Sequence, residues 1–256
     1  MDIIVCIKSV SLTAGSEGAL RSYDAVEVNP FDRPAIETAL SLREARGGTV
    51  TALSMGPAST RSTLAEALAM GVDRGVLACD PAFAGSDTLA TSTVLASAIR
   101  KLSPFDLVLF GMRTADSDTG QVGPQTAVLL DIPMVGLVHS IEPADNGLQV
   151  ERTADHFTER FEIEFPAALT IHPGAIKPRD IHLARIGPVF EEEKITFWNL
   201  GDLSLSPEQV GDAGSPTRVL SVSRAIQQKK CEFLKGSALE QADALMRQLT
   251  EAGMMG

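Results

Sequence analysis

Short apolar runs alternate with helix-like segments over roughly the first 140 residues. This alternation is typical of βαβ units, whose right-handed crossovers place successive strands parallel in one sheet. It predicts an α/β fold with a doubly wound parallel sheet of the Rossmann-like type, covered by helices on both faces. The expected strands are Ile3–Ile7, Thr49–Ser54, Gly75–Cys79, Leu107–Phe110 and Met134–Val138.

Start and stop signals mark the helices between these strands. Asn29 is expected to cap the first helix, with Pro30 in its first turn, and Gly47-Gly48 to end it. A later helix is expected to begin at a cap formed by Asp87 or Thr88. These signals support the order of strands and helices given above.

The pattern changes after about residue 140. Leu148–Glu151 and Phe157–Phe165 alternate apolar and polar residues around a polar turn, which predicts an antiparallel hairpin added at the sheet edge. Ala167–Ile171 is again apolar throughout and is expected to be a buried strand.

The C-terminal third is less regular. Residues 173–196 contain Pro, Gly and the run Glu191-Glu192-Glu193 without a sustained period, which predicts a long exposed loop or arm. Residues 201–218 are rich in Gly, Ser, Pro and Asp. A last helix is expected at Ser237–Leu249, with an apolar face for which a partner subunit is one candidate to pack on.

Composition excludes several classes of function. The formal net charge of −11 opposes an electrostatic nucleic-acid binder or an anionic-membrane binder. No apolar run approaches the roughly 20 residues that span a bilayer, so no direct membrane insertion is expected. The three cysteines form no CxxC pair, and the N-terminus lacks the pattern of a signal peptide. We therefore expect a cytoplasmic protein.

The loop after the fourth strand is the most informative candidate for a site. Gly111, Gly120 and Gly123 permit a close backbone approach, and Thr119 and Gln121 offer hydrogen bonds. The loop runs into a helix whose free N–H groups favour a phosphate. An ordinary capped βα turn fits this spacing equally well. The sequence contains no Walker GxxxxGK[ST] motif.

Two further loops are expected at the same sheet edge. They are Asn29-Pro30-Phe31-Asp32 and Met55-Gly56-Pro57-Ala58, each an ordinary cap or turn when considered alone. The four histidines have no metal-site spacing, no GxSxG motif occurs, and Cys6 lies in an apolar strand where an inert thiol is the default. A nucleotide site without catalytic side chains or a metal suggests that a cofactor carries the chemistry.

These motifs together resemble a known family. Ala115–Pro124, Asn29–Asp32, Ser54–Pro57 and Ala67–Arg74, preceded by the strand Ile3–Lys8, closely resemble the beta subunit of electron transfer flavoproteins. The resemblance covers nearly the whole chain. It implies an adenine-nucleotide-binding fold and a heterodimer with a larger alpha subunit that holds a redox FAD.

The resemblance also implies what occupies the site. Ordinary beta subunits bury a structural AMP, whereas electron-bifurcating ones bind a second FAD that accepts hydride from NADH and splits its two electrons. Such activity belongs to the complex, with ferredoxin or flavodoxin among the possible acceptors. The implied cofactor-binding residues are Cys6, Asn29, Pro30, Phe31, Asp32, Met55, Thr88, Thr91, Asp118, Thr119, Gly120, Gln121, Val122, Gly123, Pro124 and Thr126.

Two segments resemble the bifurcating branch. Asp118–Pro124 is similar to the DTAQVGP run of that branch, with Gly120 in place of the usual alanine. Phe83–Thr91 is similar as well, and would bring Thr88 and Thr91 near the flavin. We therefore favour FAD, with AMP as the alternative.

The segment Pro178–Ile186 resembles the family's recognition loop, in which a leucine anchors a flavin dehydrogenase such as an acyl-CoA dehydrogenase. Leu183 is the matching position, although a leucine folded back on its own domain is a common alternative. Glu191–Glu193 stands where some relatives carry lysines, so no particular partner is assigned. Those glutamates also fit a plain solvated surface.

The expected division is a nucleotide-binding α/β domain at 1–172, a partner recognition loop at 173–200, and a C-terminal arm and helix at 201–256 that packs on the alpha subunit. An ATP-binding protein on the same kind of sheet is the alternative from another class. It would need an SGGxDS or GxxGxxxxG(S/T) phosphate loop, and the sequence contains neither.

Overall fold

The computed structural model describes residues 1–11, 26–181, 183–191, 194–221 and 231–254, without the side chains of residues 183, 190 and 191. The chain forms two compact units, Met1–Leu220 and Ser221–Gly256. The larger unit contains the sheet and the candidate site.

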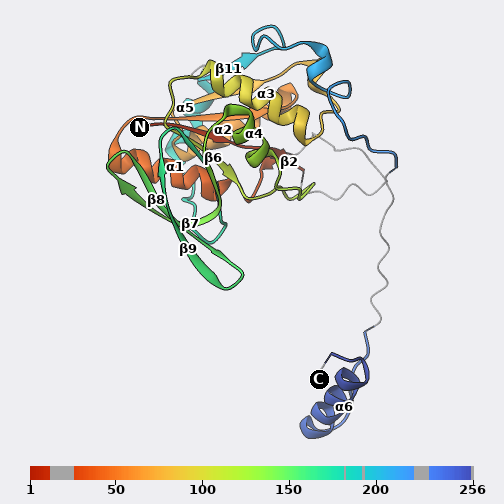
Figure 1. Cartoon of the computed structure of the whole chain (residues 1–256). Helices are drawn as coiled ribbons and strands as arrows, with labels where there is room; N and C mark the ends of the chain where they lie inside the picture. The colour runs from red at the N-terminus through yellow and green to blue at the C-terminus, as the bar shows by residue number, and fades with distance from the viewer. Residues whose placement is uncertain (12–25, 182, 192–193, 222–230, 255–256) are drawn as a thin grey trace. The chain divides into compact units, whose positions relative to one another are not determined.

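The larger unit is built on a nine-stranded sheet, counted over the described residues, in the order β11-β5-β4-β1-β6-β10-β7-β8-β9 (Figure 1). Its first seven strands in this order are parallel, and the last two are antiparallel. The strands are β1 (Asp2–Cys6), β4 (Thr49–Met55), β5 (Arg74–Ala78), β6 (Leu107–Gly111), β7 (Met134–Ala144), β8 (Gly147–Ala154), β9 (Phe157–Glu164), β10 (Ala167–Ile171) and β11 (Ile195–Trp198). A separate two-stranded ribbon joins β2 (Ser9–Val10) and β3 (Glu27–Val28).

Helices cover both faces of the sheet, as the doubly wound prediction requires. On β1, Ile3 and Val5 pack with α1 and α2 residues, while Ile4 and Cys6 pack with α3 and α4 residues. This alternation buries both faces of the strand, which is why β1 is apolar at successive positions. The helices are α1 (Arg33–Arg46), α2 (Arg61–Met70), α3 (Thr88–Lys101), α4 (Val122–Leu130), α5 (Leu183–Glu191) and α6 (Ala238–Glu251), with short 3-10 turns η1 (Ala58–Thr60), η2 (Pro81–Phe83) and η3 (Pro207–Gln209).

The sheet order reverses direction at β1. From β1 the chain builds outward through β4 to β5, and then returns to place β6 on the other side of β1. The crevice outside the carboxyl ends of β1 and β6 is therefore the topological switch point, where open α/β sheets bind ligands. The doubly wound fold and the added antiparallel hairpin, β8 with β9, are confirmed.

Two predictions about local structure are wrong. The first helix begins at Arg33, with Asp32 rather than Asn29 at the N-cap position. Residues 173–196, predicted as an irregular loop, contain α5 and the start of β11. They are ordered by long-range contacts: β11 pairs with β5, and Val189 of α5 is buried in the core.

Buried residues near Leu220 set the extent of the larger unit. The larger unit continues past residues 172 and 200 to Leu220, because Leu203 and Val210 are buried in the core and Ser215 is buried as well. The functional roles expected for residues 173–200 and 201–256 stay predictions.

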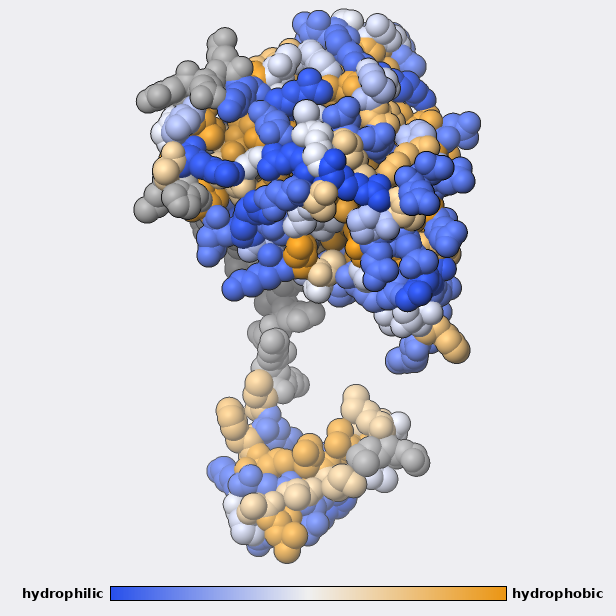
Figure 2. All heavy atoms as spheres, turned by 90° about the vertical axis from the view of Figure 1, so that its left-hand side faces the viewer, coloured by the Kyte–Doolittle hydropathy of each residue, from blue (hydrophilic) through white to orange (hydrophobic). Residues whose placement is uncertain are grey.

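The smaller unit contains the predicted last helix, α6. Ser237 and Glu240 form a capping box at its start, which fixes where the helix begins. No α6 residue is buried, and Leu239, Leu245 and Met246 are exposed. Figure 2 shows apolar side chains, in orange, gathered on this unit. Among the residues described, no helix is long and apolar enough to cross a membrane.

Candidate functional site

The candidate site lies at the switch point, where two loops from distant parts of the sequence meet. One loop, residues 29–32, leads into α1, and the other, residues 112–121, connects β6 to α4. The 112–121 loop follows the carboxyl end of β6, and the 29–32 loop follows the β2–β3 ribbon that comes after β1 in the chain. Because β1 and β6 are neighbours in the sheet, the sheet order brings the two loops together.

Asn29 joins the two loops. Its Nδ2 donates to the carbonyl oxygen of Arg113 at 2.9 Å and to Asp32 Oδ1 at 2.8 Å. The backbone N–H of Ala115 donates to Asn29 Oδ1 at 3.1 Å. Asn29 is buried, so these bonds satisfy its amide. The side chain expected to cap α1 therefore anchors the 112–121 loop instead.

Asp32 lies beneath this junction. Its Oδ2 accepts a hydrogen bond from the backbone N–H of Lys8 at 2.7 Å, which ties α1 to the end of β1. Burial raises the pKa of Asp32 to about 7, against the lowering effect of the Lys8, Asn29 and Gly111 hydrogen bonds. Asp32 occupies the N-cap position of α1 but makes no side-chain cap hydrogen bond. Its carboxyl group instead accepts hydrogen bonds from Lys8 and Asn29 beneath the two loops.

Gly111 permits the close approach of β6 to the 29–32 loop. A Cβ atom at this position would lie 2.6 Å from the carbonyl oxygen of Phe31 and closer still to Asp32 Oδ1. The glycine predicted to allow backbone approach thus makes room for the protein's own loop.

Two ion pairs border the 112–121 loop. Lys8 Nζ lies 2.7 Å from Asp116 Oδ1, and Arg113 Nη1 lies 3.2 Å from Asp118 Oδ1. The Arg113 guanidinium also stacks over the Phe31 ring, 4.6 Å from its centroid. The sequence alone assigned no role to Lys8, Arg113 or Asp116. The feature that could have identified them is their alternating charge near a glycine-rich loop.

The start of α4 lies at the end of the glycine-rich 112–121 loop. Gln121 is its N-cap residue and makes no side-chain cap hydrogen bond. By contrast, Asp87 caps α3 by accepting from the N–H groups of Leu89 and Ala90, each at 3.0 Å. The first turn of α4 therefore has no side-chain cap, as at α1 and α2, and its first N–H groups are open to another acceptor. Uncapped N–H groups beside Gly120, whose φ is +61°, suit a phosphate group.

The start of α3 lies against the same loop. Thr88 Oγ1 donates to Gln121 Oε1 at 3.1 Å, so two of the predicted residues meet across the two helices. Ser92 Oγ donates to the carbonyl oxygen of Val122 at 3.2 Å and lies 3.2 Å from Gln125 Oε1. Ser92 was not among the predicted residues, and these contacts fix α4 on α3.

The other predicted residues occupy varied positions. Cys6 packs in the core among α3 and α4 residues, and burial, with the charge of Asp32 adding to it, raises the pKa of its thiol. Thr126 is buried, and its Oγ1 has no hydrogen-bond partner among the described residues; Met55 is half-buried at the end of β4. Leu183 is the first residue of α5, which lies far along the sequence from the loops of the site. Half-buried Thr91 and exposed Pro30, Thr119 and Pro124 complete the set, together with half-buried Val122 and buried Gly123.

The described residues contain no group of three or more His, Cys, Asp or Glu side chains that could hold a metal ion. The donors that surround the 112–121 loop are backbone N–H groups, hydroxyls, an ammonium and a guanidinium. This donor set fits the phosphates of a nucleotide cofactor.

Comparison with known proteins agrees with this geometry. The family described as "Electron transfer flavoprotein domain" matches residues 20–195. The chain is 36% identical to the electron transfer flavoprotein subunit beta of Thermoanaerobacterium thermosaccharolyticum, over 97% of this chain and 98% of that protein. The corresponding subunit of Clostridium acetobutylicum is also 36% identical, over 98% of each chain. The caffeyl-CoA reductase-Etf complex subunit CarD of Acetobacterium woodii is 36% identical, again over 98% of each chain. The chain folds as a doubly wound sheet with an uncapped, glycine-rich loop at its switch point, and these subunits match it along nearly its full length. It therefore belongs to the electron transfer flavoprotein family, as a beta-subunit member that functions in electron transfer.

Proposed function

We propose that this chain is the beta subunit of an electron-bifurcating electron transfer flavoprotein and binds FAD at the carboxyl ends of β1 and β6. The observation that carries the proposal is the uncapped start of α4 within a glycine-rich loop at the switch point. When bound, FAD would supply one- and two-electron chemistry. The chain's own residues bind and orient the cofactor.

The binding roles follow from the positions of the donors. The first N–H groups of α4 would face the phosphates, favoured by the positive end of the helix. Thr88, at the start of α3 and already bonded to Gln121, would contact the cofactor beside the loop. Asn29 and Asp32 would act beneath it by keeping the 112–121 loop in place before the nucleotide arrives.

The choice of FAD over AMP depends on the similarity of Asp118–Pro124 and Phe83–Thr91 to the bifurcating branch. The name of the Acetobacterium relative places that protein in a complex of an Etf with a reductase. This supports a similar complex here, with the alpha subunit and a flavin dehydrogenase as partners, NADH as electron donor, and ferredoxin or flavodoxin as an acceptor. Residues 173–200 would recognise the dehydrogenase, and residues 201–256 would pack on the alpha subunit.

Cofactor counting tests the proposal. The chain is purified with its alpha subunit, and the bound nucleotides are released and identified by chromatography. Two FAD per heterodimer support bifurcation, while one FAD with one AMP supports a non-bifurcating electron transfer flavoprotein. A complex without bound nucleotide refutes the proposal. Tight ATP binding without flavin would instead favour the ATP-binding alternative.

A double substitution locates the site. Asp118→Ala with Gln121→Ala should lower nucleotide retention while leaving the melting temperature nearly unchanged, because both side chains are exposed polar groups of the loop. Glu142→Ala with Gln149→Ala is a matched control, since this acid and amide lie opposite each other in the β7–β8 pair. Equal nucleotide content in both variants would place the site elsewhere.

A further inference from the structure

Helix α5 depends on contacts with other elements to stay in place. It is nine residues long and contains Gly187 and Pro188, so its intrinsic helix stability is low. Among its residues with described side chains, Val189 is buried and the others are exposed. Among the described side chains of α5, Val189 supplies the apolar anchoring, and polar contacts also hold the helix on the sheet domain.

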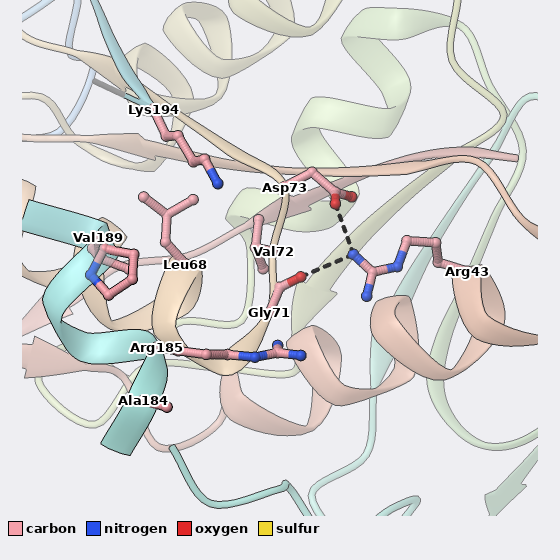
Figure 3. A pocket seen from close by; sticks show the side chains of 10 residues that line it. Arg43, Leu68, Gly71, Val72, Asp73, Ala184, Arg185, Val189 and Lys194 are labelled. Carbon is pink, nitrogen blue, oxygen red and sulfur yellow. Dashed lines mark hydrogen bonds and ion pairs between the residues drawn. The ribbon is translucent and has the colours of Figure 1, made fainter. Parts of the chain in front are cut away.

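A cavity of about 460 Å³ lies between α5 and the ends of α1 and α2 (Figure 3). Arg185 of α5 reaches across it and donates to the carbonyl oxygen of Met70 at 3.4 Å, at the C-terminus of α2. In Figure 3 its guanidinium lies beside Gly71, where a Cβ atom would collide with it. The space means that α5 rests on few contacts rather than on a packed interface.

The strongest attachment lies just before α5. Arg179 Nε and its backbone N–H donate to Glu37 Oε2 at 2.8 and 2.9 Å, and Arg179 Nη2 donates to Glu37 Oε1 at 2.8 Å. Arg179 Nη1 donates to Glu44 Oε1 at 2.7 Å. Both acids lie on α1, so the guanidinium attaches the chain to that helix at two points about two turns apart.

The surroundings make this attachment rigid. The Glu37 side chain is 8% exposed, and the Arg179 side chain is 29% exposed. Burial alone would raise the pKa of Glu37, but the Arg179 hydrogen bonds outweigh it and lower that pKa. A buried carboxylate with its guanidinium removed would be left unpaired, so the arrangement is strongly favoured in the folded protein.

We propose that Arg179, together with Glu37 and Glu44, is a positioning residue that fixes α5 for docking to the redox partner. The proposal rests on the proposed role of residues 173–200 in partner recognition. Arg179 precedes α5 by four positions, and its guanidinium is engaged by Glu37 and Glu44 of α1. Its effect would therefore appear in partner affinity and not in the cofactor site.

The test uses the complete heterodimer with Arg179→Ala. Electron transfer is measured with an acyl-CoA dehydrogenase of the same organism as the partner, and separately with a small dye as acceptor. We expect the KM for the dehydrogenase to rise about tenfold, equal to about 1.4 kcal/mol, with kcat and the dye rate unchanged. Nucleotide content should also match the wild type. An unchanged KM would overturn the proposal.

Hydrogen exchange provides a readout that needs no partner. Backbone amides of residues 183–191 should exchange faster in Arg179→Ala, while those of α4 should not change. The matched control is Arg160→Ala, which removes an exposed ion pair with Glu151 on the hairpin. Equal exchange of α5 in both variants would also overturn the proposal.

A second variant covers the case in which Arg179→Ala does not fold. Glu44→Gln removes one arm of the attachment at an exposed carboxylate and leaves the Glu37 pair intact. It should raise the KM and the α5 exchange by a smaller factor, and no change in either would refute the role. If the wild-type heterodimer carries nucleotide but transfers no electrons to the dehydrogenase, the partner assignment fails, whereas the exchange result still decides whether Arg179 fixes α5.

Discussion

The substitution Gly111→Ala tests whether the switch point depends on close contact between β6 and the 29–32 loop. The added Cβ would lie 2.6 Å from Phe31 O and 2.8 Å from Phe31 C, whereas Cβ atoms in proteins essentially never approach heavy atoms within 3.0 Å. The φ of Gly111 is not among the positive values, so backbone strain does not contribute. The whole effect is therefore steric.

The magnitude follows from what must move. Two of the close atoms belong to the backbone of Phe31, so the loop must shift by at least about 0.4 Å and disturb the buried Asp32. Overpacking of this kind costs roughly 1–3 kcal/mol. At about 2–4 °C per kcal/mol for a unit of this size, the melting temperature should fall by roughly 2–12 °C.

Gly187→Ala is the matched control, because it adds the same atom where nothing lies within 4 Å. Alanine is also the better helix former by about 1 kcal/mol, so this variant should be neutral or slightly stabilised. Both variants are compared by thermal unfolding and by nucleotide content after purification with the alpha subunit. Wild-type stability and full nucleotide content in Gly111→Ala would refute the idea that this contact shapes the site.

Two acids offer further predictions. Burial raises the pKa of Asp32 from 3.8 to about 7. Between these two pH values the folded protein keeps a proton on Asp32 that the unfolded chain has released. The contribution of Asp32 to the free energy of unfolding therefore falls by about 1.4 kcal/mol per pH unit as the pH rises through that range. Asp32→Asn should remove that slope in denaturant titrations at pH 5 and 7, and identical slopes would contradict the burial argument. Asp87→Ala should cost about 1–2 kcal/mol by uncapping α3. Burial alone would raise the pKa of Asp87, but hydrogen bonds from Ala90 and Thr217 lower it, so the cap should weaken as the pH falls and a pH-independent loss would count against it.

Local patterns were sufficient to predict most of the fold. Strands buried on both faces, such as β1 and β6, are apolar throughout, and Gly47 and Gly71 do end α1 and α2. The pattern failed at α5, where Gly187 and Pro188 hide the helical signal. It failed at β11 because four residues give no reliable period, and their order comes from pairing with β5, more than 100 residues earlier.

The positions of the loops at the candidate site were predictable, and the contacts of their side chains were less so. Gly120 and Gln121 could be placed from the sequence in the loop directly before α4, and their phosphate-binding role stays a prediction. The role of Asn29 could not, because its contacts are with Arg113 and Ala115, which only the sheet order brings near. An asparagine can either cap a helix or anchor a loop, and the residue type is the same in both cases. Tertiary contacts decide between the two roles.

The charges at the candidate site bear on how the proposed site of an acidic chain would attract phosphate. The net charge is −11, and the two cations of the 112–121 region, Lys8 and Arg113, are each paired with an aspartate, Asp116 and Asp118. These four side chains therefore add no net positive charge. The attraction must come mainly from oriented backbone N–H groups, which carry partial charge without a counter-ion. In the proposed site a carboxylate in place of Gln121 would set a negative charge against the phosphates at the start of α4, where the uncharged amide does not.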